Sequence, residues 1–95
     1  MNILEEANKI VNLRSEEKTR QYGSFSEGMK RAAKILSGMR GREFSSDDMF
    51  AAMIALKFSR ESFNHKNDNM LDAAAYLGAW QNYIDESKTE EKNPL

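Results

Sequence analysis

The strongest structural signal of this 95-residue chain lies in residues 49–72, which read MFAAMIALKFSRESFNHKNDNMLD. From Met49 to Phe58 the only polar residue is Lys57. A helix over this segment carries apolar side chains on every side and must be covered over most of its surface. The polar residues that follow predict a tight connection, so that residues 57–72 form the hairpin between two antiparallel helices.

The spacing of apolar residues predicts helices along most of the chain, because these residues recur three and four positions apart. After the hairpin they form one packing seam, which contains Met70, Ala73, Leu77, Trp80 and Ile84. Before the hairpin they form two stripes, Ile3, Leu4, Ala7, Ile10 and Val11 in the first and Phe25, Met29, Ala32, Ala33, Leu36 and Met39 in the second. No segment alternates as a strand does. The predicted fold class is therefore all-α, a four-helix bundle.

Two helix starts are marked by capping residues. Ser24 is followed three positions later by Glu27, the pattern of a capping box in which each side chain satisfies a free backbone donor. Ser45 and Asp48 form a similar, weaker signal before the third helix. The single proline, Pro94, interrupts no helix before the end of the chain.

The length of the chain corresponds to one domain. We expect a single helical domain over residues 1–86 and a flexible polar tail over residues 87–95. So short a bundle cannot easily bury a helix that is apolar on every side, so we expect a homodimer or a higher oligomer built on the third and fourth helices. The alternative is that the first two helices supply the cover.

The composition argues against several classes of protein. The absence of cysteine excludes disulfide scaffolds, cysteine-rich zinc sites and thiol nucleophiles. A net charge of -1 gives no broad positive field, so nothing supports nucleic-acid binding. The longest apolar run, Met49 to Leu56, is too short to cross a bilayer, and the N-terminus lacks the features of a signal peptide. We expect a cytoplasmic protein with no membrane partner.

The hairpin gathers the residues most able to bind a ligand. Lys57 and Arg60 are three positions apart and share one face of their helix, as Asn69 and Asp72 do on the next. Cations that face carboxylates beside a helix N-terminus can hold a phosphate, directly or through Mg²⁺. The predicted phosphate-binding residues are Lys57, Arg60 and Asn69, and the predicted metal ligands are Asp68 and Asp72.

Most of these residues also have a structural explanation. The stem of Lys57 can lie along its apolar helix with the amine in water, while Arg60 and Asp68 complement the dipoles of the helix ends. His65, the only histidine, lies in a polar loop, as a surface residue would. Asp72 is different, because a carboxylate beside the packing seam is costly unless Lys57, Arg60 or a metal ion pairs with it.

Three segments resemble a family of small phage and prophage proteins. They are Lys18-Thr-Arg-Gln-Tyr22-Gly-Ser, then Asp48 leading into Leu-Lys57-Phe-Ser-Arg60, and His65-Lys-Asn-Asp-Asn69-Met-Leu-Asp72-Ala-Ala-Ala-Tyr76. These proteins look like relatives of the MazG-type all-α nucleoside triphosphate pyrophosphohydrolases. The resemblance covers roughly residues 3 to 80 and adds Lys18 and Tyr22 to the predicted nucleotide-binding residues.

The resemblance implies an oligomeric helical bundle that handles nucleotides with Mg²⁺. In active enzymes of this kind, acidic pairs on two neighbouring helices hold the metal ions. Here Asn69-Met-Leu-Asp72 keeps the spacing of one pair with an amide in place of its first acid, and the facing helix has no acid between Met49 and Arg60. Lys57 and Arg60 repel a cation, but they bind phosphate oxygens well.

Three functions follow from these observations. The first is a phage-type MazG-like protein that binds a nucleotide or a phosphorylated signal at the hairpin, with hydrolysis left open. The second is a Mg²⁺-dependent pyrophosphohydrolase in which Asp48 or Glu27 joins Asp68 and Asp72 across the bundle or from another subunit. The third is a small phage protein that binds and inhibits a host protein in the host cytoplasm.

Overall fold

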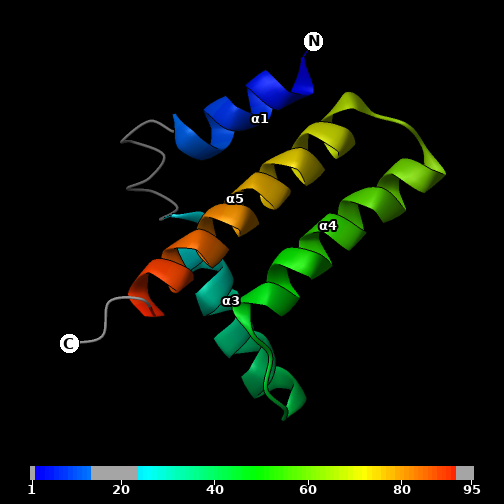
Figure 1. The fold of residues 1–95 in the computed structure, drawn as a ribbon. Coiled ribbons are helices and arrows are strands. Elements are labelled where there is room, and N and C mark those ends of the chain that lie inside the picture. Colours follow the sequence, from blue (N-terminus) through cyan, green and yellow to red (C-terminus); the bar gives the residue numbers. More distant parts are fainter. Residues whose placement is uncertain (1, 14–23, 92–95) are drawn as a thin grey trace.

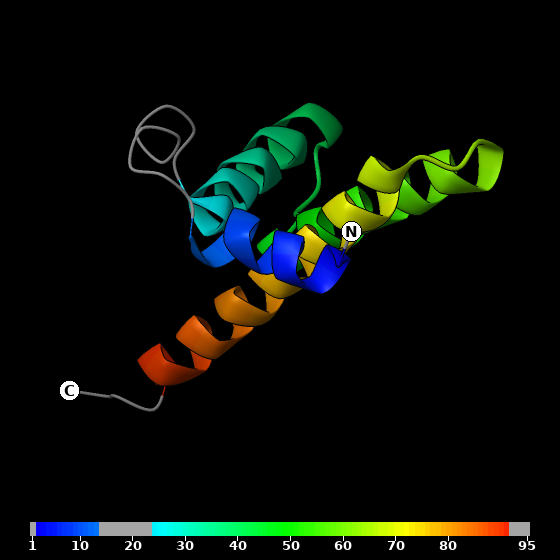
Figure 2. The same cartoon turned by 90° about the horizontal axis from the view of Figure 1, so that it is seen from above.

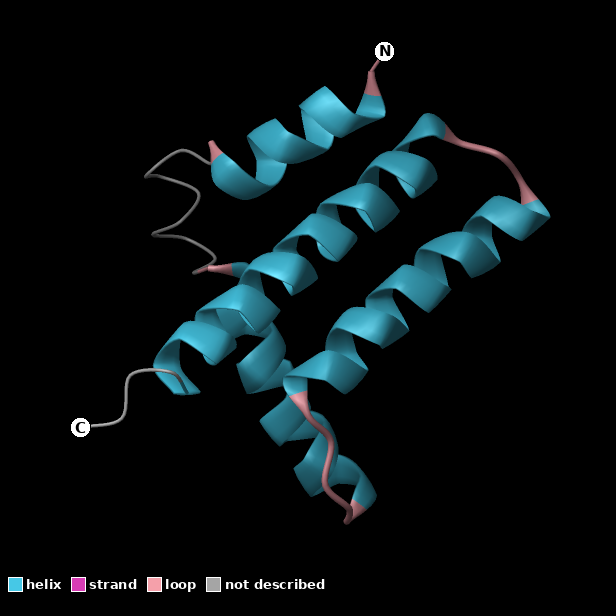
Figure 3. Ribbon diagram, viewed as in Figure 1, coloured by secondary structure: helices cyan, strands magenta, loops and turns pink. Residues whose placement is uncertain are grey.

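The computed structural model describes residues 2–13 and 24–91, with side chains to residue 88. Within these residues the chain forms helices α1 (Ile3–Asn12), α3 (Phe25–Arg40), α4 (Ser46–Phe63) and α5 (Asn67–Glu91), and no strand (Figure 3). The predicted all-α fold class is confirmed. No helix in the described part of the chain is long and apolar enough to cross a membrane.

The fold is organised around the antiparallel hairpin of α4 and α5. These two helices lie side by side, and α1 packs on α5 away from α4 (Figure 1). Helix α3 crosses the hairpin near the start of α4 and stands on one side of the layer that α4 and α5 form (Figure 2). Helix α3 does not reach the far end of the hairpin, around residues 57–72, where the N-terminal end of α1 lies along α5 on the side away from α4 (Figure 1).

Side-chain caps fix where α3 and α4 begin. Ser24 Oγ accepts a hydrogen bond from the Glu27 N–H at 3.2 Å at the start of α3. At the start of α4, Ser45 Oγ accepts from the Asp48 N–H at 3.2 Å and Asp48 Oδ2 accepts from the Ser45 N–H at 2.8 Å, which completes a capping box. Helix α3 ends at Gly41, whose φ of 69° suits a residue without a Cβ. Both predicted helix starts are confirmed.

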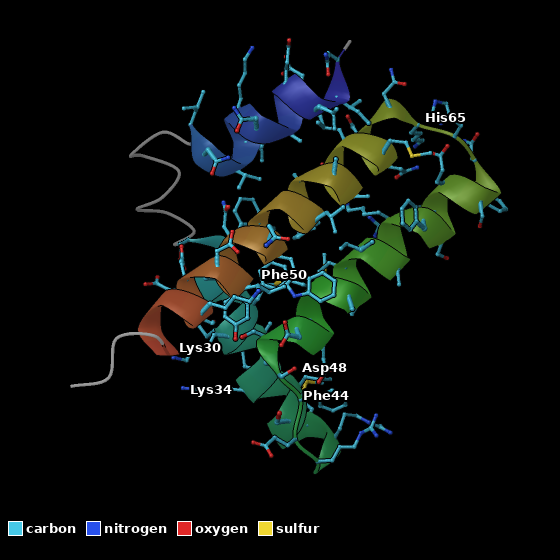
Figure 4. The ribbon with its side chains drawn as sticks, viewed as in Figure 1. Lys30, Lys34, Phe44, Asp48, Phe50 and His65 are labelled. Atoms are coloured by element: carbon cyan, nitrogen blue, oxygen red, sulfur yellow. The ribbon has the colours of Figure 1, made fainter. Side chains whose placement is uncertain are left out.

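An aromatic cluster fills the end of the hairpin that α3 crosses. Phe50 is fully buried and stacks on Trp80, with ring centroids 6.1 Å apart, and its ring lies 5.8 Å from that of Tyr83 (Figure 4). Trp80 Nε1 donates to Asp47 Oδ1 at 2.7 Å, so the indole also holds the first turn of α4. The other buried apolar residues in the described part of the chain are Ala7, Ala33, Ala73, Ala75 and Ala79.

The packing seam predicted for α5 is only partly buried. Ala73 is buried, whereas Met70 and Leu77 are exposed, Leu77 by 60%. The reason is that α5 packs between α4 and α1, so that the contacts fall on two sides of the helix and the side carrying Met70 and Leu77 faces neither neighbour. The other described helices also leave α4 partly uncovered, because Ala52, Leu56 and several other residues of α4 are exposed in the single chain.

Helix α5 continues beyond the predicted end of the domain at residue 86. It runs to Glu91, five residues into the segment expected to be a tail. No glycine or proline follows Gly78 before Pro94, and Gln81 Nε2 donates to Asp85 Oδ1 at 2.9 Å along the helix surface. Charged residues with good helix propensity therefore extend α5 here, where a polar composition alone predicted a frayed end.

Candidate functional site

An ion pair joins the two helices near the open end of the hairpin. Lys57 Nζ on α4 lies 3.0 Å from Asp72 Oδ2 on α5. The Lys57 side chain is 14% exposed and that of Asp72 is 39% exposed, so the pair is partly shielded from water. This contact confirms that Asp72 has a basic partner across the hairpin, and it identifies Lys57 rather than Arg60 as that partner.

One helical turn after Lys57, Glu61 makes a second polar contact between the helices. Its Oε1 accepts hydrogen bonds from Asn69 Nδ2 at 3.3 Å and from the Lys66 N–H at 3.2 Å. Asn69 is buried and its Nδ2 also lies 3.5 Å from the Asn64 carbonyl oxygen. Glu61 and Asn69 therefore tie the connecting loop to both helices.

His65 pairs with the other oxygen of the same carboxylate. Its Nδ1 is hydrogen-bonded to Glu61 Oε2 at the bend of the hairpin (Figure 4). This hydrogen bond raises the pKa of His65, and the coulombic attraction of the carboxylate acts in the same direction. The same bond is the main cause that lowers the pKa of Glu61, with smaller contributions from Lys66 and Asn69 and an opposing one from desolvation. The charged forms of both residues are favoured.

An open pocket of about 670 Å³ lies beside these two contacts. Its lining residues are Lys57, Ser59, Arg60, Phe63, Asn64, Lys66, Asp68, Asn69 and Asp72. The structure thus brings together the predicted residues Lys57, Arg60, Asp68, Asn69 and Asp72 around one pocket. The other two predicted residues, Lys18 and Tyr22, lie outside the described part of the chain.

Two of the pocket's cations are available to a ligand. Among the described residues, neither the Arg60 guanidinium nor the Lys66 ammonium makes a hydrogen bond or an ion pair. Helix α5 begins at Asn67, so its first turn contributes the positive end of a helix dipole on the same side. Asp68 falls within that first turn rather than at the cap position. The pocket therefore combines unpaired cations with a helix N-terminus.

Comparison with known proteins places the chain in a family. Residues 2–84 match DUF6378, which is described as a domain of unknown function. The chain belongs to the DUF6378 family. This DUF6378 domain is also 31% identical over 85 residues to the Gene 55 protein of Mycobacterium phage D29, a match that covers 88% of this chain and 54% of that protein. The chain thus spans about half the length of that phage relative. No solved structure matches.

Within the part of the DUF6378 domain that the structure describes, the acidic residues of one chain do not gather into a magnesium site. The described residues contain no group of three or more acidic, histidine or cysteine side chains that could hold a metal ion. Asp72 is paired with Lys57, whose ammonium repels a cation. Asp48 caps α4 at the other end of the hairpin from His65, and neither Asp48 nor Glu27 lines the pocket (Figure 4). The donor set suits an anion better.

Glu61 is a residue of the candidate site that the sequence pattern did not single out. The stretch without acids, from Met49 to Arg60, ends directly before Glu61. The signal lay in the spacing, because Glu61 follows Lys57 by four positions and so occupies the same helix face. Lys57 and Glu61 on α4 consequently face Asp72 and Asn69 on α5.

Proposed function

We propose that this DUF6378 domain binds a phosphate group of a nucleotide or of another phosphorylated small molecule in the pocket at the α4–α5 hairpin. The observation that carries this proposal is the pair of cations, Arg60 and Lys66, that line the pocket without a partner among the described residues. A guanidinium offers two parallel N–H donors that match two phosphate oxygens, and an ammonium adds a point charge.

The charge balance of the pocket supports an anionic ligand. Lys57 and Asp72 neutralise each other, so an incoming phosphate interacts mainly with Arg60, Lys66 and the first turn of α5. Asp68 is the one opposing charge in that set, and as a residue of the first helical turn it already interacts with the helix dipole. The balance remains positive without a metal ion, so binding requires no magnesium.

We also propose that the domain is a distant member of the MazG-like group. Support comes from the motifs that surround the hairpin and from the facing arrangement of Lys57 and Glu61 with Asp72 and Asn69. Where active enzymes of that group have acidic pairs on two helices, this domain has a lysine and an amide at two of the four facing positions. Such a site can hold a phosphorylated ligand, and it lacks the negative charge that metal-dependent hydrolysis needs.

The side of the hairpin opposite the pocket carries several exposed apolar side chains. Residues two positions apart in an α-helix point about 200° apart, so Phe58 and Arg60 lie on opposite sides of α4, and Met70 and Asp68 on opposite sides of α5. Since Arg60 and Asp68 line the pocket, Phe58 and Met70 belong to the reverse side. The exposed apolar members of this reverse face are Ala51, Ala55, Phe58, Met70 and Leu77.

We propose that two copies of the chain associate through the reverse face. Two α4–α5 layers packed face to face bury the exposed Phe58 and Leu77 and form a bundle of four helices, in which the small side chains of Ala51 and Ala55 allow close approach. Leu77→Glu should convert the dimer to a monomer in sedimentation velocity. The matched control is Leu4→Glu, which changes an exposed leucine of α1 and should leave the mass unchanged. A wild-type monomer at every concentration contradicts this arrangement.

Thermal unfolding with a panel of nucleoside mono-, di- and triphosphates tests the phosphate site. At least one of these ligands should raise the melting temperature of the wild-type domain, with Mg²⁺ and with EDTA alike. Arg60→Ala and Lys66→Ala should each remove most of the shift. Arg40→Ala and Lys34→Ala are the matched controls, since both change exposed cations of α3 outside the pocket. No shift for the wild type, or equal loss in the controls, would overturn the proposed function.

A further inference from the structure

The pocket has one aromatic side chain on its rim, and that side chain is almost fully accessible. Phe63, the last residue of α4, lines the pocket and is 93% exposed. Single exposed apolar residues are common on protein surfaces. Phe63 differs from them because it stands beside Arg60 and Lys66, which have no partner among the described residues, in a pocket whose other lining residues are polar or charged.

We infer that Phe63 is a stacking platform for a nucleobase, so that the ligand is a nucleotide rather than a phosphorylated compound without an aromatic ring. The inference rests on the proposed function and names the class of ligand. A base stacked on an aromatic ring needs no matching hydrogen-bond pattern, so the platform accepts purines and pyrimidines alike.

The spacing along α4 suits a ligand with a phosphate at one end and a ring at the other. Phe63 follows Arg60 by three positions, so the two side chains are neighbours on one side of the helix. Arg60 binds phosphate while the ring of Phe63 meets the base. Ser59 and Asn64 line the same pocket and offer a hydroxyl and an amide to the sugar or the base edge. The pocket volume of about 670 Å³ is that of a site for a small organic ligand.

Phe58 provides a natural comparison within the same helix. It is also an exposed phenylalanine, at 53%, but it lies on the reverse face and does not line the pocket. An effect that comes from apolar surface in general, or from association of two copies, should therefore appear when Phe58 is changed. An effect that comes from stacking in the pocket should appear only when Phe63 is changed.

Calorimetric titration in EDTA of the four common nucleoside triphosphates and of inorganic tripolyphosphate tests the inference. Wild-type protein should bind its best nucleotide about tenfold more tightly than tripolyphosphate, a gain typical of one stacked base. Phe63→Ala should remove that gain and leave tripolyphosphate binding unchanged. Phe63→Trp should keep the gain, whereas Phe63→Leu, which has no aromatic face, should lose it. Phe58→Ala should bind both ligands as the wild type does.

Each contrary result has a distinct meaning. The stacking role of Phe63 is wrong if nucleotide affinity is unchanged in Phe63→Ala or is kept in Phe63→Leu. It is also wrong if Phe63→Ala weakens the binding of nucleotide and of tripolyphosphate equally. If the wild type binds tripolyphosphate as tightly as every nucleotide, the platform is wrong while the phosphate site stands. If it binds none of these ligands, the proposed function is wrong and the platform with it.

Discussion

The two ends of the α4–α5 hairpin are built from different chemistry, although the same two helices form both. At the end that α3 crosses, Phe50 and Trp80 stack in an aromatic cluster. At the other end, the helices are joined by the Lys57–Asp72 ion pair and the Glu61–Asn69 hydrogen bond as polar contacts. The first end is the core of a small helical domain. At the second end, charged and polar side chains stand between the helices where apolar side chains could have been buried.

This difference supports the proposal that the polar end binds the ligand. Partly buried charges stabilise a fold less than well-packed apolar side chains of similar size would. A polar end is therefore hard to explain by stability alone in a chain with so little core. The open pocket lies at this end, with Arg60 and Lys66 making no ion pair to any residue that the structure describes.

The largest stability effect should come from the aromatic end. Phe50→Ala removes the one large side chain that is fully buried in the described part of the chain and should cost about 3–5 kcal/mol. Urea unfolding at a fixed protein concentration measures this cost. Leu4→Ala, at an exposed position of α1, should stay within about 0.5 kcal/mol of the wild type. A cost below about 1 kcal/mol for Phe50→Ala would break the distinction between the two ends.

A double-mutant cycle measures the coupling energy of the Lys57–Asp72 ion pair at the polar end. Lys57→Met and Asp72→Asn, alone and together, should give a coupling energy of about 1 kcal/mol, because the pair is partly but not fully shielded. The matched cycle uses Lys9 and Glu6 of α1, whose side chains lie 3.4 Å apart and are more exposed. That cycle should give less than about 0.5 kcal/mol. Equal coupling in the two cycles would show that burial adds nothing at the hairpin.

The smallest effect should come from the Glu61–His65 pair at the bend. Because the pKa of His65 is raised, its protonated ring stabilises the fold at pH values below 6.5, the ordinary pKa of histidine. This stabilisation is lost as the pH rises through the raised pKa. Because the pKa of Glu61 is lowered, its carboxylate stabilises the fold at pH values above 4.5, the ordinary pKa of glutamate. This stabilisation is lost as the pH falls through the lowered pKa. The pair should therefore be strongest between pH 4.5 and 6.5.

The single histidine makes this pair easy to follow by NMR. The ring resonances of His65 should report a pKa above 6.5 in the wild type. In Glu61→Gln this pKa should move back toward 6.5. The control Glu43→Gln changes an exposed acid outside the hairpin and should leave the titration as it is. An unchanged titration in Glu61→Gln would show that Glu61 does not raise the pKa of His65.

Much of the fold follows from apolar spacing and capping residues. The all-α class, the helix starts at Ser24 and Ser45 and the hairpin were all predicted, because each depends on neighbours close in sequence. The exposure of Leu77 was not, since spacing shows that one side of a helix is apolar but not whether another helix covers it. The continuation of α5 to Glu91 was missed because a polar surface helix and a polar tail have similar compositions.

The sequence predicted which residues of the candidate site lie near one another better than it predicted how they pair. The helical spacing of charged residues around the hairpin predicted that Lys57, Arg60 and Asp72 lie at one end of the bundle. In the structure they line one pocket there. The spacing could not decide which cation pairs with Asp72, because Lys57 and Arg60 both face the connection. The exposure of Phe63 depends on the loop and on α5, and no local pattern reports it.

Amide shift mapping by NMR tests the central claim most directly. Tripolyphosphate added to the labelled domain in EDTA should shift the backbone amides from Arg60 to Asn69 and leave those around Phe50 and Trp80 in place. Arg60→Ala should abolish these shifts, and Arg40→Ala should not. Shifts that fall on the basic side of α3 around Lys30 and Lys34, which lines a separate shallow pocket, or no shifts at all, would contradict a phosphate site at the polar end of the hairpin (Figure 4).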